Sequence, residues 1–185
     1  MHEENPWKKI ESREIYDNPW INLTEFRVLN PAGKPGIYGK VHFKNLAIGI
    51  VAIDSSDQIV LVGQYRFPID KYSWELPEGG GALGTDPLDS AKRELLEETG
   101  LVAENWSEIL RMHLSNSVSD ELAIIYLAES LTQHEAQPEE TEQLEIKKIP
   151  FEEAFEMVMK GEITDSMSVA AILKMKCLSF CKKVS

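Results

Sequence analysis

The amino-acid sequence predicts an α+β fold, in which helices enclose a mixed sheet and a small antiparallel β subdomain comes first. Strand-like and helix-like segments are mixed along the chain without the regular alternation of a βαβ protein. Residues 1–43 show strand and turn signals, whereas a well-delimited helical segment covers residues 87–99. We therefore expect an N-terminal β subdomain over residues 1–43 and a larger domain over residues 44–185.

The strands are predicted from apolar patterning and from the turns between them. Residues 22–28 alternate with period two, and residues 47–53 form a nearly continuous apolar run that suits a buried strand. Turn clusters lie at residues 30–36 and 55–57, and an extended piece at residues 74–77 leads into a glycine-rich loop. Strands are expected at residues 8–12, 22–28, 39–43, 47–53, 58–64, 107–113, 122–128 and 144–149. Helices are expected at residues 87–99, at residues 151–160, and after a cap at Asp165 or Ser166.

The helix over residues 87–99 is the best delimited element. Asp86 can cap its N-terminus, Pro87 suits the first helical position, and Gly100 is a typical C-terminal signal. The apolar stripe that this helix would bury consists of Leu88, Ala91, Leu95 and Leu96.

The formal net charge of -12 limits the classes of partner. It argues against nonspecific nucleic-acid binding, which needs an electropositive surface. A phosphorylated substrate would be repelled unless bound cations reverse the local charge. Cys177 and Cys181 lie four residues apart on a predicted helix, so we expect buried thiols rather than a zinc site or a disulfide scaffold. Because no signal sequence or long apolar run is present, we expect no membrane association and a cytoplasmic location.

Three carboxylates cluster on the helix over residues 87–99. Glu94 lies three residues before Glu97 and four before Glu98, which places all three on one face. One interpretation is a solvated acidic face. The other is a site for a hard cation such as Mg²⁺, which prefers carboxylate oxygens. The preceding glycine-rich segment, residues 78–84, favours the metal site because glycines let a backbone approach a ligand closely.

Together these segments resemble the signature of the Nudix hydrolase family. Gly79 matches its first glycine, residues 93–101 match its second half, and Thr85 replaces the first Glu of the signature. The resemblance implies an αβα sandwich in which Arg93 orients the metal-binding carboxylates. A pairing of Arg93 with Glu97, or the neighbouring Asp86, can compensate for Thr85. The implied ligands of Mg²⁺, or alternatively of Mn²⁺, are Glu94, Glu97, Glu98 and the backbone carbonyl of Glu78.

Further stretches resemble the branch of this family that contains ADP-ribose pyrophosphatases and other nucleoside diphosphate sugar hydrolases. These stretches are residues 64–68, 74–79 and 161–165. The resemblance implies Mg²⁺-dependent cleavage of the diphosphate bridge of an ADP-ribose or GDP-mannose type of substrate, giving a nucleoside monophosphate and a sugar phosphate. The alternatives are a nucleoside triphosphate pyrophosphohydrolase and a non-catalytic nucleotide-sugar sensor, although a sensor would not need all three carboxylates.

The same resemblance implies a general base in the acidic loop at residues 137–142. Glu142 is the first choice and Glu140 the second, and a solvated acidic loop is the alternative. Arg66 suits the diphosphate because a guanidinium can bind phosphate through two donors, the alternative being a surface ion pair. Glu75 is expected either to contact substrate hydroxyls or a base edge, or to form a structural ion pair.

In the resembling branch the N-terminal region pairs two subunits, so a homodimer is expected. Trp20 and Tyr16 lie in this region, and an exposed ring there can stack on the nucleobase. For Phe26 we favour packing in the core or in the interface. The loop after the strand at residues 107–113 is expected to place Asp120 and Glu121 near the sugar.

Overall fold

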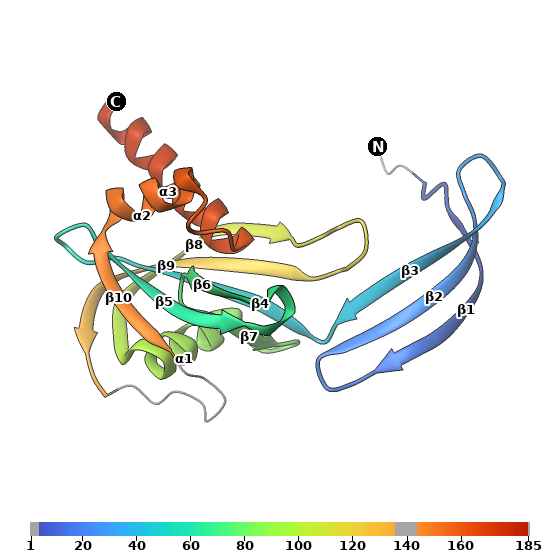
Figure 1. Cartoon of the computed structure of the whole chain (residues 1–185), viewed down its shortest axis with the longest axis horizontal. Coiled ribbons are helices and arrows are strands. Elements are labelled where there is room, and N and C mark those ends of the chain that lie inside the picture. The colour runs from blue at the N-terminus through green and yellow to red at the C-terminus, as the bar shows by residue number, and fades with distance from the viewer. Residues whose placement is uncertain (1–3, 136–143, 185) are drawn as a thin grey trace. The chain divides into compact units, whose positions relative to one another are not determined.

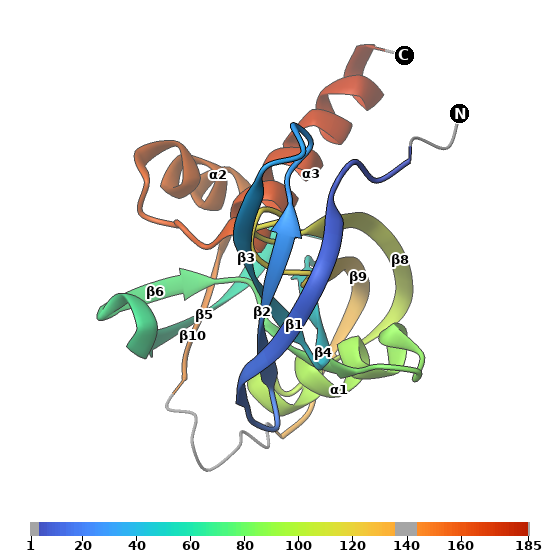
Figure 2. The same cartoon turned by 90° about the vertical axis from the view of Figure 1, so that its right-hand side faces the viewer.

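The computed structural model describes residues 4–135 and 144–184, and the chain divides into two compact units. Unit 1 consists of Met1–Asn45 and His113–Leu122, and unit 2 consists of Leu46–Met112 and Ala123–Ser185. Figure 1 shows the elements of both units, and Figure 2 shows them turned by 90°. Unit 1 is discontinuous in sequence, because a segment from the middle of the chain joins the N-terminal strands.

Unit 1 is built on an antiparallel sheet of β1 (Lys8–Asp17), β2 (Ile21–Leu29) and β3 (Pro35–Phe43), in that order. Asn18 fixes the turn between β1 and β2, because its Oδ1 accepts the backbone N–H groups of Trp20 and Ile21 at 2.8 and 2.7 Å. β3 starts earlier than the predicted residue 39, since Pro35 and Gly36 pair with the end of β2. The proline is tolerated because β3 is an edge strand.

The segment His113–Leu122 is attached to β3 through backbone bonds at Val41, through the Tyr38 hydroxyl and through Asp120. The carboxylate of Asp120 lies 2.5 Å from Lys40 Nζ and 2.7 Å from His42 Nδ1, and it accepts the Phe43 N–H at 3.1 Å. Burial would raise the pKa of Asp120, but these three partners outweigh it and lower the pKa to about 2. Asp120 therefore has a structural role inside unit 1.

Within the described residues, unit 2 contains two sheets and three α-helices. The first sheet has the order β7-β4-β9-β8 with β4 and β9 parallel, and the second has the antiparallel order β10-β5-β6. In both views α1 lies on one side of the strands and α2 and α3 lie on the other (Figures 1 and 2). This layered arrangement confirms the predicted fold class. The elements are β4 (Asn45–Ala52), β5 (Gln58–Arg66), a 3-10 turn (Phe67–Ile69), β6 (Lys71–Glu75), β7 (Glu78–Ala82), α1 (Pro87–Thr99), β8 (Leu101–His113), β9 (Leu122–Gln133), β10 (Glu145–Pro150), α2 (Phe151–Lys160) and α3 (Ser166–Val184).

The core of unit 2 lies between these layers. The apolar run predicted as a buried strand is β4, and its parallel neighbour β9 is buried over most of its first half. The middle of β5, in the second sheet, is buried as well. Among the helices in the described part of the chain, none has both the length and the apolar character needed to cross a membrane. Fully buried side chains of the core include Ile48, Ile50, Ile59, Leu61, Leu95, Ile125 and Ile172.

Three further expectations about local structure were wrong. The glycine-rich segment was expected to be a loop, but it contains β7, whose backbone pairs with β4. β8 and β9 are longer than predicted, because they are neighbours in one sheet and each extends the other's ladder. Cys177 was expected to be buried and is exposed. A four-residue spacing shows which residues share a helix face but not which face is covered. The side chain of Cys181 lies outside the described residues.

Candidate active site

Helix α1 carries the clustered carboxylates on its buried face. It begins as predicted, with the Asp86 side chain accepting the Leu88 N–H at 3.0 Å, and it ends at Gly100, which has a φ of 71°. Glu94 is only 8% exposed and Glu98 only 2% exposed. Carboxylates are rarely buried this deeply unless polar partners or a cation satisfy them.

The partner of this face is the glycine strand β7. A Cβ atom added at Gly79 would lie 2.2–2.4 Å from the carboxylate atoms of Glu94, so a side chain cannot be accommodated unless Glu94 moves. Glu98 Oε2 accepts the backbone N–H of Glu78 at 3.1 Å. Gly79 is thus required by the close approach of its backbone to the Glu94 carboxylate, whereas the sequence suggested only that the glycines let a backbone approach a ligand.

Arg93 connects the carboxylates of α1 to β7. Its Nη2 donates to Glu94 Oε1 at 2.6 Å and to the carbonyl of Gly80 at 3.0 Å, and its Nη1 donates to Glu97 Oε2 at 2.6 Å. Burial opposes the charge on this guanidinium, but Glu94 and Glu97 outweigh it and raise the pKa of Arg93. Thr85, which replaces a Glu of the signature, instead donates its hydroxyl to the carbonyl of Ala82. The pairing of Arg93 with Glu97, which was expected to compensate for Thr85, is present.

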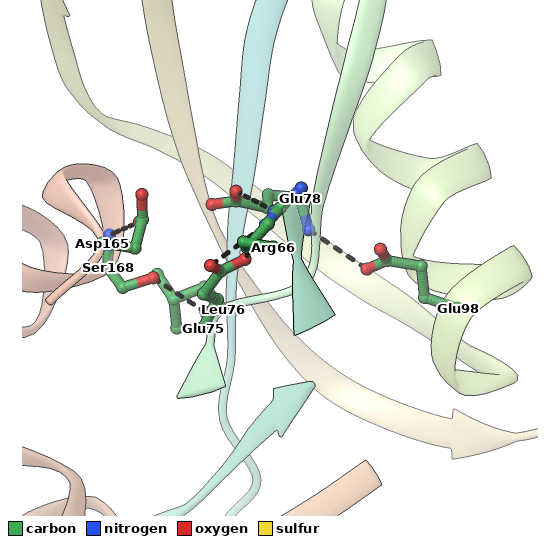
Figure 3. Close-up of polar contacts among 7 residues, drawn as sticks. All are labelled: Arg66, Glu75, Leu76, Glu78, Glu98, Asp165 and Ser168. Atoms are coloured by element: carbon green, nitrogen blue, oxygen red, sulfur yellow. Dashed lines mark hydrogen bonds and ion pairs between the residues drawn. The ribbon is translucent and has the colours of Figure 1, made fainter. Parts of the chain in front are cut away.

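A second cluster of charges centres on Arg66 (Figure 3). Its Nε and Nη2 donate to the carboxylate of Glu75, the Nη2 bond being 2.5 Å long, and Nη2 also donates to Glu78 Oε1 at 2.6 Å. Glu75 is 3% exposed, whereas the Arg66 side chain is 35% exposed, so the carboxylate of this ion pair is withdrawn from water and the guanidinium only partly. Burial works against the charge of Arg66, but Glu75, Glu78 and Asp165 raise its pKa. In this structure Glu75 forms the structural ion pair that was one of its two predicted roles.

Glu78 is the most unusual group in this cluster. Its side chain is about nine-tenths buried, and its Oε2 atom has no hydrogen-bond partner among the described residues. Burial raises the pKa of Glu78 well above the ordinary value, the negative charges of Asp165, Glu75 and Glu98 raise it further, and Arg66 only partly opposes them. The negative charges around Glu78 are therefore only partly neutralised by Arg66.

This environment fits a divalent cation in its donor chemistry. Glu94 touches Gly79, Glu98 accepts from the backbone of Glu78, and Arg93 donates to Gly80, so the carboxylates gather around one short stretch of backbone. Hard cations such as Mg²⁺ prefer such oxygen donors, and a buried carboxylate oxygen without a partner is a natural ligand. In the parts of the chain that are described, no three His, Cys, Asp or Glu side chains already stand in a metal-binding arrangement.

Sequence patterns did not reveal two residues of this cluster. Asp165 was interpreted only as a helix cap, and Ser168 was not singled out. In the structure Asp165 Oδ2 accepts the Ser168 N–H at 2.7 Å, and Ser168 Oγ accepts the Leu76 N–H at 2.9 Å (Figure 3). Ser168 and Leu76 are 92 residues apart in the chain, so no local signal could indicate this contact.

The remaining predicted site residues lie in unit 1 or outside the described residues. Trp20 is 65% exposed next to the β1–β2 turn, and Tyr16 is 54% exposed near the end of β1. Glu121 is half-buried, and burial raises its pKa. The two candidate bases, Glu140 and Glu142, lie outside the described residues.

Unit 1 also contains an aromatic pocket that sequence analysis did not anticipate. It has a volume of about 260 Å³ and lies between the sheet and the segment His113–Leu122. Trp7 and Tyr38 meet edge to face across it, with ring centroids 5.4 Å apart. Phe26 lines the same pocket and is half-buried, and Lys9 Nζ lies 4.9 Å from its ring centroid. Its packing in the core or in an interface stays a prediction.

Comparisons with known proteins agree with this geometry. The family model of the NUDIX domain matches residues 43–168, and that of the nucleoside diphosphate sugar hydrolase N-terminal domain matches residues 7–41. The chain is 33% identical over 175 residues to an ADP-ribose pyrophosphatase of Mycobacterium tuberculosis, covering 92% of this chain and 83% of that protein. It is 30% identical over 167 residues to a methanol dehydrogenase activator of Bacillus methanolicus, covering 89% and 90%.

A solved structure shows the same fold. The crystal structure of an ADP compounds hydrolase matches with a TM-score of 0.86 over 98% of both chains, at 16% sequence identity. The matching domain covers more than half of this chain, and it includes Gly79 and the segment 93–101 on which the family was predicted. The chain therefore belongs to the Nudix hydrolase family.

Proposed function

We propose that this protein hydrolyses the diphosphate bridge of a nucleoside diphosphate sugar, with ADP-ribose as the first candidate, to a nucleoside monophosphate and a sugar phosphate. The observation that carries the proposal is the contact between the Glu94 carboxylate and Gly79, with Glu98 bonded to the neighbouring backbone N–H. The match to the nucleoside diphosphate sugar hydrolase N-terminal domain supports the substrate class. The relative named ADP-ribose pyrophosphatase supports the choice of ADP-ribose.

The residues of α1 and β7 would hold the metal. Glu94, Glu97, Glu98 and the backbone carbonyl of Glu78 are its proposed ligands, and Arg93 holds two of these carboxylates at the glycine strand. Bound Mg²⁺, or Mn²⁺ in its place, would neutralise negative charge on the phosphates and lower the pKa of a bound water. The net charge of -12 makes this neutralisation necessary for an anionic substrate.

Arg66 is the proposed ligand of the diphosphate. Its Nε and Nη2 are occupied by Glu75 and Glu78, and within the described residues its Nη1 makes no hydrogen bond. A guanidinium carries five N–H donors in a fixed plane, so Glu75 can hold one edge while a phosphate oxygen binds another. Glu75 then acts chiefly by fixing the orientation of Arg66.

The general base is proposed to be Glu142, with Glu140 as the second choice. Both belong to the acidic loop at residues 137–142, whose carboxylates are the right chemical type to take a proton from the attacking water. Replacing each by glutamine separately distinguishes them. The variant that lacks the true base should lose on the order of 10²–10⁴-fold in kcat, whereas the other variant should keep a kcat near the wild-type value.

Unit 1 is proposed to supply the base-binding residues and a dimer interface. Trp20 and Tyr16 present exposed rings that can stack on a nucleobase, and Glu121 is a candidate contact to the sugar. Ile10, Ile15 and Ile37 are exposed apolar side chains on the sheet of unit 1, and covering them would favour a homodimer. Light scattering after gel filtration tests the dimer, since a monomer mass at micromolar concentration would exclude it.

The activity is tested with a substrate panel in the presence of Mg²⁺. ADP-ribose, GDP-mannose, other sugar nucleotides and nucleoside triphosphates are incubated with the enzyme, and phosphate release is read after coupling to a phosphatase. We expect turnover of a nucleoside diphosphate sugar above that of the triphosphates. Preference for triphosphates would indicate a pyrophosphohydrolase of that class, and calorimetric binding without turnover would indicate a sensor.

A separate variant tests the proposed metal ligands. Glu98→Gln removes one charge from a buried ligand position and should abolish Mg²⁺-dependent turnover. Glu153→Gln, on the exposed surface of α2, makes the same chemical change away from the site and serves as the control. Near-normal activity of Glu98→Gln would rule out the proposed ligand set.

A further inference from the structure

The short connection between β6 and β7 is held by three different elements. It consists of Leu76 and Pro77, and it separates the two carboxylates that bind Arg66, namely Glu75 and Glu78. Leu76 is completely buried, so an unpaired N–H group there would be costly. The three bonds run from Leu76 N to Ser168 Oγ of α3 at 2.9 Å, from Ile50 N of β4 to Pro77 O at 2.9 Å, and from Glu78 N to Glu98 Oε2 of α1 at 3.1 Å.

Ser168 is itself held in place by the start of α3. Asp165 precedes the first helical residue, and its Oδ2 accepts the Ser168 N–H at 2.7 Å while its carbonyl accepts the Val169 N–H at 2.9 Å. This is the usual geometry of a helix N-cap. Ser168 is 0% exposed, so its hydroxyl is fixed by both the cap and the surrounding packing.

A displacement of Leu76 would be transmitted to both sides of the connection. Towards β6 it would move Glu75, which holds Nε and Nη2 of Arg66. Towards β7 it would move Glu78, which holds Arg66 through its side chain and is the residue whose carbonyl is the proposed metal ligand. The Leu76 N–H and the Glu75 carbonyl belong to one planar peptide unit, so a shift of this N–H moves the end of β6 with it.

We propose that Ser168 is a positioning residue, which acts through the Leu76 N–H to set the places of the Glu78 carbonyl and of the Arg66 guanidinium. The expected effect of Ser168 on catalysis rests on the proposed function. The placement of the Glu78 carbonyl and of Arg66 by Ser168 does not. It assigns to the start of α3 a function in the active site, beyond its role in packing. Groups that orient metal ligands without touching the metal commonly change metal affinity or activity by about 10–100-fold when removed.

The test compares Ser168→Ala with Ser90→Ala. Both changes remove a hydroxyl from a buried serine of unit 2, but the Ser168 hydroxyl accepts the Leu76 N–H, whereas Ser90 lies on α1 beside Gly81. Hydrogen exchange is read for the Leu76 amide, and Mn²⁺ affinity is measured by calorimetry without substrate. For Ser168→Ala we expect exchange at Leu76 to be roughly 10–100-fold faster, because its buried N–H loses its acceptor. We also expect Mn²⁺ affinity and kcat/KM each to fall about tenfold or more, whereas Ser90→Ala should keep wild-type values.

Two substitutions of the N-cap residue Asp165 test the proposal even if Ser168→Ala fails to fold. Asp165→Asn keeps an oxygen that can cap the Ser168 N–H, so it should protect Leu76 as the wild type does. Asp165→Ala removes the cap and should show faster exchange at Leu76 and weaker Mn²⁺ binding. A merely structural role would lower the thermal midpoint of Ser168→Ala while leaving Mn²⁺ affinity and kcat/KM unchanged well below that midpoint, and this result would overturn the proposal.

These measurements distinguish a failure of the positioning role of Ser168 from a failure of the proposed function. If the wild type hydrolyses no substrate of the panel, the proposed function fails, but exchange at Leu76 and Mn²⁺ affinity still decide whether Ser168 positions the site. If the wild type is active and Ser168→Ala matches it in all three measurements, the proposed function stands and the positioning role is wrong.

Discussion

Gly79→Ala should impair catalysis much more than stability. The added Cβ would lie 2.2–2.4 Å from the Glu94 carboxylate, whereas ordinary contacts begin at 3.4 Å, so the carboxylate must retreat by about 1 Å. Arg93 resists this movement because its Nη2 is bonded both to Glu94 and to the carbonyl of Gly80. A misplacement of about 1 Å in a catalytic group can cost on the order of a hundredfold in rate. Weakening one partly exposed ion pair should cost only about 1 kcal/mol of the free energy of unfolding.

The assay is kcat/KM for the best substrate of the panel, with urea unfolding measured in parallel. Gly49→Ala is the matched control, because its Cβ would meet Ile125 at 3.5 Å, an ordinary contact, in the neighbouring strand β4. Gly81→Ala is the contrasting variant, since its Cβ would approach Ile48 to 2.9 Å and should mainly destabilise the fold, by about 1–3 kcal/mol. A Gly79→Ala variant that keeps kcat/KM within about threefold of the wild type, or that loses activity only in proportion to unfolded protein, would refute this prediction.

Three other predictions follow from ion pairs. Arg66→Ala leaves the buried Glu75 without its counter-ion and should lower the free energy of unfolding by about 3–5 kcal/mol in urea titrations at neutral pH; a smaller loss than for an exposed arginine would contradict this. Asp120→Asn should cost about 1–2 kcal/mol at pH 7 after allowance for solvent screening. Because the folded state lowers the pKa of Asp120 from 3.8 to about 2, the stabilisation is present above pH 3.8 and disappears as the pH falls through about 2, which thermal unfolding between pH 7 and 2 can follow. Thr85→Glu should change kcat/KM by less than about fivefold, because Arg93 is already paired; a large increase would show that the natural site is impaired.

The elements that the sequence predicted well are those with local signals. Helix α1 starts and ends where Asp86, Pro87 and Gly100 indicate, because capping is decided within one turn of the chain. The alignment of Glu94 and Glu98 on one face also follows from helix geometry alone. The family could therefore be predicted from a single helix and the glycines before it.

What the sequence could not predict depends on distant partners. The segment around Gly79 was expected to be a loop because glycine is typical of turns, but pairing with β4 makes it a strand. Gly79 is required by its contact with Glu94 of helix α1 rather than by a turn. In the same way, the contact of Ser168 with Leu76 joins segments 92 residues apart and has no signature in either.

The two arginines of the site explain how an acidic protein can be arranged to accept a diphosphate. Arg93 is bound to Glu94 and Glu97, and Arg66 is bound to Glu75 and Glu78, so both guanidinium charges are largely neutralised by carboxylates. These arginines therefore orient the site more than they attract the substrate. The raised pKa of Glu78, caused by burial and by the carboxylates around it, indicates that negative potential remains. A cation bound among these oxygens would neutralise the remaining negative potential and would also attract an anionic substrate. Both substrate affinity and catalysis would then depend on the bound metal.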